Sequence, residues 1–288
     1  NQKNKFNTIR RLSLVVALSL GAMTSGLALE LKKGEHVILI GNSLAERMQH
    51  HGWLESYVQG TMAKKKLVFR NHGFAGDKVN NRPRNNGFPS ADAYLEISKA
   101  DVILAFWGYN ESFDNSPDAF SADLAKWVDE TNSKKYNGEV APRLVLLSPI
   151  AHENLGQANL PDGSANNERL AKYTEATRQV ANEKGIEFVD LFSLSQELYE
   201  SSKKPLTING IHLTSEGNKQ LAQGIYKNLF GKAPRVGKRK LGRIQDSVLN
   251  KNWHWYNRYR ATDGNDVWGG RSGLAFVSKQ TNRVVLQH

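Results

Sequence analysis

The stretch that decides the fold is HVILIGNSL, residues 36–44. Its apolar run is typical of a buried strand, and Gly41-Asn42-Ser43 then reads as a turn into a helix that Ser43 can begin. Taken alone, Ser43 is explained by a helix-capping role. In an open α/β sheet, however, the functional site lies at the carboxyl ends of the strands, so the same position also suits a nucleophile.

Similar apolar runs recur along the chain and alternate with helical patterns. The predicted strands are His36–Ile40, Leu67–Asn71, Asp101–Trp107, Arg143–Ser148 and Glu187–Asp190. Helical spacing of apolar residues covers 44–62, 120–128 and 170–181, and a last helix is expected from Thr214 or Ser215 to Gly231. Segments 73–94 and 149–166 are expected to be loops. This rhythm predicts a three-layer α/β/α sandwich around a mainly five-stranded parallel sheet.

The two ends of the chain differ from this central part. Residues 1–28 have a basic start, an apolar stretch and small residues before a cleavage site after Ala28, which is typical of a secretory signal peptide. We therefore expect a secreted or periplasmic protein with no membrane segment after cleavage. Residues 29–232 form the predicted domain, and residues 233–288 a basic linker and aromatic-rich extension. No closing element precedes His288, so the chain is also compatible with being part of a longer protein.

Charge and cysteine content exclude several classes of function. The net charge is +11, but residues 1–28 carry four basic and no acidic side chains, and residues 233–288 carry 11 basic and three acidic ones. The predicted domain is therefore almost neutral, which argues against nucleic acid as a partner. The chain has no cysteine, which excludes disulfides, thiolate metal sites and a cysteine nucleophile. No metal-binding or phosphate-cradling motif is present, and no cofactor is expected.

Ser43 and a late histidine, His212 in NGIHL, together suggest a hydrolase with a serine nucleophile and a histidine base. The serine elbow of α/β-hydrolases requires Gly-x-Ser-x-Gly, whereas Ala45 occupies the last of these positions. A different fold is therefore indicated.

Four separated blocks resemble the SGNH (GDSL-like) hydrolase superfamily. They are GNSL at 41–44, NHGFAGD at 71–77, GYN at 108–110 and NGIH at 209–212, within a match that spans roughly residues 34–232. The resemblance implies a flavodoxin-like esterase fold in which Ser43 is the nucleophile and His212 the base. It also implies that Gly76 and Asn110 donate to the oxyanion. Backbone N–H groups at a helix N-terminus and at a glycine, with an amide side chain, are donors that acyl transfer requires.

Asn209 departs from the expected pattern, because an acid at this position would orient the histidine and stabilise its protonated form. Asp190 is a candidate for the substitute acid, but a cap after the fifth strand explains it better. Three outcomes stay open: a serine–histidine dyad with another partner, a slow enzyme, or a domain that has lost catalysis and binds a polysaccharide.

Further candidates surround the predicted site. Glu111 follows Asn110, and His152 and Asn154 lie on the segment that leaves the fourth strand, so these three are predicted to contact substrate. The expected substrate is a small-molecule or polysaccharide ester, with O-acetylated carbohydrate as the class that the resemblance and export favour. The aromatic residues at 253–259 are interpreted as packing against the core, with sugar stacking as the alternative.

Overall fold

Five parallel strands form a single sheet in the order β2-β1-β3-β4-β5. The computed structural model describes residues 28–84, 89–260, 273–274 and 281, so most of the predicted signal peptide lies outside the described residues. The strands are β1 (His36–Gly41), β2 (Val68–Asn71), β3 (Val102–Phe106), β4 (Arg143–Leu147) and β5 (Glu187–Val189). Every predicted strand is found, and each bound lies within one residue of its prediction.

The strand order positions the site. After β1, the next strand, β2, pairs with one edge of β1. The chain then crosses back, and β3 pairs with the other edge of β1. Such a reversal creates a crevice at the carboxyl ends of the two central strands. The segments after β1 and β3, which carry Ser43 and Asn110, leave the sheet at this crevice.

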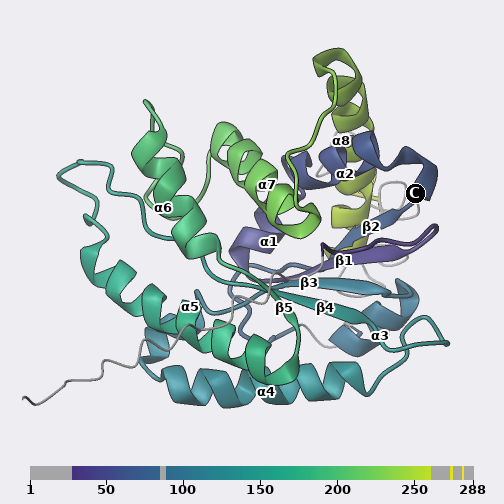
Figure 1. Cartoon of the computed structure of the whole chain (residues 1–288), viewed down its shortest axis with the longest axis horizontal. Helices are drawn as coiled ribbons and strands as arrows, with labels where there is room; N and C mark the ends of the chain where they lie inside the picture. The colour runs from purple at the N-terminus through teal and green to yellow at the C-terminus, as the bar shows by residue number, and fades with distance from the viewer. Residues whose placement is uncertain (1–27, 85–88, 261–272, 275–280, 282–288) are drawn as a thin grey trace, which may run out of the picture.

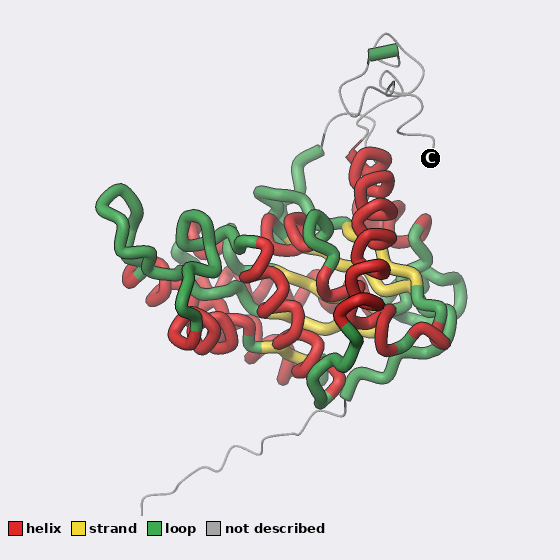
Figure 2. Tube along the Cα trace, turned by 90° about the horizontal axis from the view of Figure 1, so that it is seen from above, coloured by secondary structure: helices red, strands yellow, loops and turns green. Residues whose placement is uncertain are grey.

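Helices cover both faces of the sheet, as Figure 1 shows, and the strands lie enclosed between them in Figure 2. One face carries α1 (Ser43–Met48), α2 (Trp53–Thr61) and α7 (Ser215–Phe230); the other carries α3 (Ala91–Ile97), α4 (Pro117–Asn132) and α5 (Ser164–Lys184). The remaining elements are α6 (Leu191–Ser201), α8 (Lys238–Arg260) and two 3₁₀ turns, η1 (Ala63–Lys65) and η2 (Glu111–Asp114). The predicted three-layer α/β fold is confirmed.

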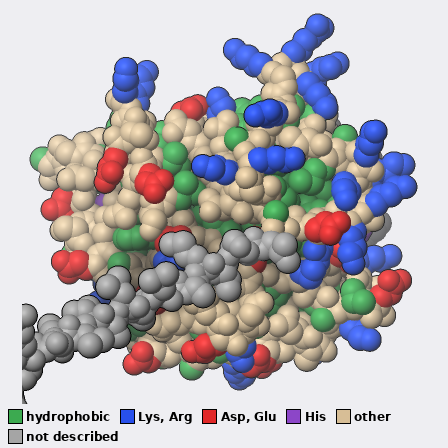
Figure 3. All heavy atoms as spheres, in the orientation of Figure 1, with side chains coloured by type: hydrophobic (Ala, Val, Ile, Leu, Met, Phe, Trp, Pro, Cys, Tyr) green, Lys and Arg blue, Asp and Glu red, His purple; other side chains and the backbone are tan. Residues whose placement is uncertain are grey.

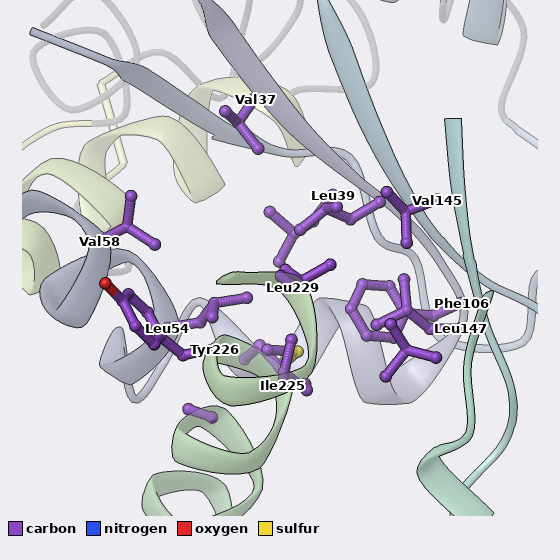
Figure 4. Close-up of a cluster of buried hydrophobic side chains, with 14 of the residues drawn as sticks. Val37, Leu39, Leu54, Val58, Phe106, Val145, Leu147, Ile225, Tyr226 and Leu229 are labelled. Atoms are coloured by element: carbon purple, nitrogen blue, oxygen red, sulfur yellow. The ribbon is translucent and has the colours of Figure 1, made fainter. Parts of the chain in front are cut away.

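Each layer of helices buries its own hydrophobic core against the sheet. In Figure 4, Leu54 and Val58 from α2 and Ile225 and Leu229 from α7 point toward strand residues such as Leu39. Because the strands are buried on both faces, their sequences are continuously apolar rather than alternating. This explains why the strands could be predicted from the sequence alone.

Local signals set several helix ends as predicted. The Thr214 side chain caps α7 by accepting a hydrogen bond from the N–H of Gly217, and Gly231 ends the helix with a φ of 71°. Asp190 caps α6 in the same way by accepting from Ser193, which confirms its interpretation as a cap. The helical pattern at 44–62, in contrast, is two helices, because Gly52 interrupts it with a φ of 64°.

The main difference from the prediction is at residues 238–260, expected to belong to a linker and extension but folded as helix α8. Leu241, Ile244 and Val248 are spaced to form one apolar stripe, which the abundance of basic residues obscured in the sequence. The helix lies beside α2 and the edge strand β2 (Figure 1). Covering this edge prevents its unpaired backbone groups from recruiting another strand.

Side-chain contacts to neighbouring elements hold α8 in place. Lys251 pairs with Glu55 of α2 at 2.7 Å, and the indole of Trp255 donates to the carbonyl of Asn71 at 2.7 Å. Trp255 also stacks on His72, whose pKa burial lowers to about 3, so this ring is neutral. The prediction that the aromatic cluster packs against the core holds for Trp255; Asp263, Asn265, Asp266 and Trp268, which follow it, lie outside the described residues.

Among the described helices, none combines the length and apolar character that crossing a bilayer requires.

Candidate active site

Ser43 is the first residue of α1, directly after β1. The chain turns sharply at Gly41, which has a φ of 143° and lies so close to β3 that a Cβ would collide with the carbonyl oxygen of Phe106. Only glycine combines this backbone angle with this approach. The turn places the Ser43 side chain and its free N–H at the carboxyl end of the sheet, where a helix N-terminus favours negative charge.

Ser43 and His212 line the same narrow pocket. Its walls are mostly apolar and come from β3 and the residues after it, from the segment after β4, and from the loop that carries His212, called the histidine loop below. The apolar lining residues are Phe106, Trp107, Tyr109, Pro149, Ile150, Ile211 and Leu213. Within the described part of the chain, Ser43 Oγ makes no hydrogen bond, and a contact between nucleophile and base often tightens only around a substrate. The structure therefore brings the predicted nucleophile and base, 169 residues apart in sequence, to one cavity.

The loop that carries His212 is fixed by a buried carboxylate. Glu153 is 7% exposed, and its oxygens accept hydrogen bonds from the N–H groups of Leu206 and Thr207 and from the Thr207 hydroxyl at 2.6 to 3.1 Å. Its own N–H donates to the carbonyl of Gly210 at 2.8 Å. Thr207 and Leu213 in turn form an antiparallel bridge that closes the loop. The position of His212 is therefore set mainly by contacts outside the imidazole.

Asn209 contacts His212 as the expected acid would. Its Oδ1 accepts the His212 backbone N–H at 3.0 Å, while its Nδ2 and Oδ1 lie 3.0 and 3.2 Å from His212 Nδ1. An aspartate would accept only from a protonated Nδ1, which leaves Nε2 free to take a proton. The amide can satisfy either tautomer, because it carries both a donor and an acceptor. Asn209 therefore orients the ring without selecting the tautomer that general base catalysis requires.

The surroundings of His212 disfavour its charged form. Burial lowers the pKa of His212, the nearby Arg47 charge lowers it further, and Glu46 opposes the shift. The ring is thus neutral, as a base must be, over a wider pH range than a free histidine. Asp190 does not serve as the missing acid, since its carboxylate caps α6 and pairs with Arg178 at 2.7 Å.

The loops after β2 and β3 are joined to each other and to the start of α1. The N–H of Phe74 donates to the Gly41 carbonyl at 2.9 Å, and Asn110 Nδ2 donates to the Asp77 carbonyl at 3.0 Å. Asn110 keeps a second amide hydrogen for another acceptor. Gly76 is exposed with a φ of 88°, and no other atom crowds the place that a Cβ would take. Gly76 and Asn110 thus lie together beside the loop that follows Ser43's strand.

The three predicted substrate contacts occupy different places. Glu111 is 4% exposed, and its carboxylate accepts from the N–H groups of Val79 and Gly108. His152 is 5% exposed and lies against Gly210 beneath the histidine loop. Asn154 is exposed and accepts from the N–H of Gly156. None of the three is among the residues that line the pocket of Ser43 and His212.

Two residues at the site were not singled out from the sequence. Glu153 holds the histidine loop, and nothing in its sequence context signals that its carboxylate reaches Leu206 and Thr207. Arg47 lines the pocket with Ser43. Its position four residues after Ser43 places both on one face of α1, and this spacing could have revealed it. No group of three or more His, Cys, Asp or Glu side chains that could hold a metal occurs among the described residues.

Comparison with known proteins gives both a family and structural relatives. The sequence profile of the GDSL-like Lipase/Acylhydrolase family matches residues 39–220. A catalytic serine variant of Axe2, an acetylxylan esterase from Geobacillus stearothermophilus, is similar with a TM-score of 0.55 and 17% identity over 70% of this chain and 96% of that one. BT4096, a gut microbial diltiazem-metabolizing enzyme, is similar with a TM-score of 0.52 and 18% identity over 70% of this chain and 48% of that one.

Another variant of Axe2, described as an acetyl-xylooligosaccharide esterase, has a TM-score of 0.56 and 18% identity over 73% of this chain and its own full length. At these identities the structural matches establish the fold. A search of curated protein sequences finds no match.

Proposed function

Because the chain belongs to the GDSL-like lipase/acylhydrolase family, it is an ester-bond hydrolase, and we propose that Ser43 and His212 carry out the hydrolysis. The observation that carries this proposal is the single pocket lined by both side chains. The resemblance of four sequence blocks, each at the end of a strand or in the final loop, supports the same assignment.

The reaction proceeds in two halves. Ser43 Oγ attacks the ester carbonyl while His212 Nε2 accepts the hydroxyl proton, and the carbonyl oxygen becomes a tetrahedral oxyanion. The N–H groups of Ser43 and Gly76 and the Asn110 amide donate to that oxyanion. When the C–O bond of the ester breaks, His212 returns its proton to the leaving alcohol. Water, deprotonated by His212, then attacks the acyl-enzyme; as the acyl–Oγ bond breaks and the acid leaves, His212 returns the proton to Ser43 Oγ.

Asn209 and two buried side chains act through other groups. Asn209 aligns His212 but supplies no charge to the imidazolium that forms in each half, so we expect turnover below that of an enzyme with an acid there. Glu111 binds the N–H groups that shape the turn before Asn110, and His152 supports the loop of Asn209. Of the predicted substrate contacts, exposed Asn154 is the one still placed to meet a bulky substrate.

The proposed substrate is an O-acylated carbohydrate with a short acyl group, such as acetate. The pocket is narrow and its walls are mostly apolar, which suits a short acyl chain. Axe2 is an acetylxylan esterase, and its catalytic variants replace a serine, a histidine and an aspartate three residues before that histidine, where this chain has Asn209. Export by the N-terminal signal pattern would bring the enzyme to extracellular polysaccharide.

The test is hydrolysis of short-chain nitrophenyl esters by the parent and by Ser43→Ala. Loss of turnover in the variant, with an unchanged thermal unfolding midpoint, supports the proposal. Equal rates would contradict it.

Asn209 also favours a second candidate, a module of the same fold that binds polysaccharide without turnover. Retention on an insoluble acetylated polysaccharide, together with no reaction at Ser43, would favour that candidate.

A further inference from the structure

Arg47 is a cation in the proposed catalytic pocket that has no partner among the residues that the structure describes. It lies on α1, four residues after Ser43, and lines the pocket with Ser43 and His212. Across the described part of the chain, its guanidinium makes no hydrogen bond or ion pair. Its Nε is buried without an acceptor. The charge acts in the pocket, since it contributes to the lowered pKa of His212.

An unpaired charge in a half-buried site is costly, because water is partly removed and nothing replaces it. The chain does not supply the missing partner: no aspartate or glutamate lines this pocket in the part that the structure describes. Neighbouring Glu46 engages His50 instead, at 3.1 Å. The cation is therefore available to a ligand.

Other pocket groups also lack acceptors. Asn42 is 2% exposed, and its Nδ2 is buried without a hydrogen-bond partner; the same holds for the indole nitrogen of Trp107. Both residues line the pocket with Arg47. The positive charge of Arg47 in this pocket, beside buried donors that have no acceptor among the described residues, complements a ligand group rich in acceptor oxygens.

We propose that Arg47 binds an anionic group, a carboxylate or a sulfate, on the sugar that carries the scissile ester. The substrate class of this esterase is then an acylated acidic carbohydrate. This proposal rests on the proposed function, because Arg47 selects substrates only if Ser43 attacks in the same pocket. A guanidinium presents its N–H groups as a planar fork that matches two oxygens of such an anion.

The surface of the molecule has the charge that an acidic polymer would meet. Figure 3 shows Lys and Arg side chains gathered at the end of the molecule formed by α2 and α8. Exposed basic residues there include Lys64, Lys66, Lys238, Arg239 and Arg243. Clustered charge of one sign raises the local concentration of an oppositely charged ligand and speeds its association. This cluster lies near the amino ends of β1 and β2, away from the pocket at their carboxyl ends, so it bears on general attraction of an acidic polymer and not on recognition of the sugar at the ester.

The experiment compares three O-acetylated probes with the same acetylation pattern: a methyl glucoside, the matching glucuronide, and the glucoside sulfated at its primary hydroxyl. The parent should have a higher kcat/KM on at least one anionic probe than on the neutral one. Arg47→Gln should lose about 10- to 100-fold on that probe, since hydrogen bonds to charged groups are of this size, and change little on the neutral probe. Arg47→Lys should retain part of the preference.

Arg239→Gln is the matched control, because it removes an exposed arginine of α8 and should leave the preference among these small probes unchanged. The anionic probe on which Arg47→Gln loses activity shows whether Arg47 binds a carboxylate or a sulfate. An equal loss of kcat/KM on all three probes in Arg47→Gln, or a parent with no preference for an anionic probe, would overturn the proposal.

A binding measurement separates this inference from the proposed function. Affinity of the same probes is measured for Ser43→Ala with and without Arg47→Gln. Weaker binding of the anionic probe in the double variant supports Arg47 even if the parent turns over none of the probes, in which case the proposed function fails. Unchanged binding overturns the role of Arg47 whatever the turnover.

Discussion

The two halves of the proposed site are built differently. On the nucleophile side, the segments after β1, β2 and β3, which carry the proposed Ser43, Gly76 and Asn110, are joined by backbone and amide contacts. On the histidine side, the loop is held as firmly, through Glu153, but a neutral amide replaces the acid next to His212. Position and charge are therefore separate requirements: backbone and side-chain contacts fix both loops, whereas Asn209 supplies no charge to His212.

The largest expected effect comes from restoring the charge. In Asn209→Asp, the new carboxylate should accept a hydrogen bond only from a protonated Nδ1 of His212 and should stabilise the imidazolium. The opposite change, aspartate to asparagine, costs about 10⁴-fold in turnover in serine proteases. We expect kcat to rise by up to about this factor, with KM nearly constant, in steady-state assays of nitrophenyl acetate. An unchanged kcat would show that the amide already supplies what the reaction needs.

The next largest effect is expected from removing an oxyanion donor on the nucleophile side. Asn110→Ala removes one proposed oxyanion donor, and loss of a single donor typically lowers kcat by about 10²- to 10³-fold. Asn228→Ala, which removes an exposed amide on α7, is the control and should keep the parent rate. If Asn110→Ala also keeps the parent rate, Asn110 only links the two loops through Asp77.

A smaller effect is expected from removing the carboxylate that holds the histidine loop, and it is measured first as a change in stability. Glu153→Gln removes a buried charge that accepts several hydrogen bonds, and the unfolding free energy should fall by about 1 to 3 kcal/mol in denaturant titration. Turnover should fall as well, because His212 loses its fixed position. Glu200→Gln on the exposed side of α6 is the matched control. A stable, fully active Glu153→Gln would mean that the loop is positioned by its own backbone contacts.

The smallest effect is on pH dependence. His212 must be neutral to act as a base, so kcat/KM is lost as pH falls through its pKa, which burial and the Arg47 charge lower. The acidic limb of the profile should therefore lie below pH 6.5, the ordinary value for histidine, and move upward in both Arg47→Gln and Asn209→Asp. A limb above that value in the parent would contradict the described surroundings of His212.

Local sequence signals explain what could be predicted. Buried parallel strands are continuous apolar runs, and caps such as Thr214 act within one turn, so the sheet and several helix ends follow from short stretches. The four sequence blocks likewise predict Ser43 and His212, which the structure brings to one pocket. What was missed depends on distant contacts: α8 is a helix because its apolar stripe meets α2 and β2, and Glu153 matters because it reaches Leu206 and Thr207. Arg47 could have been found from its spacing to Ser43, but its lack of a partner among the described residues is visible only in the structure.

The most direct test of the account is labelling of Ser43 by a fluorophosphonate probe, followed by intact mass and peptide mapping. We predict one label per chain, located on Ser43 and absent from Ser43→Ala. Labelling should be faster in Asn209→Asp than in the parent, because the activated nucleophile requires the charge that Asn209 lacks. A parent that stays unlabelled, or a label that persists in Ser43→Ala, would contradict the claim that Ser43 and His212 form a working catalytic pair.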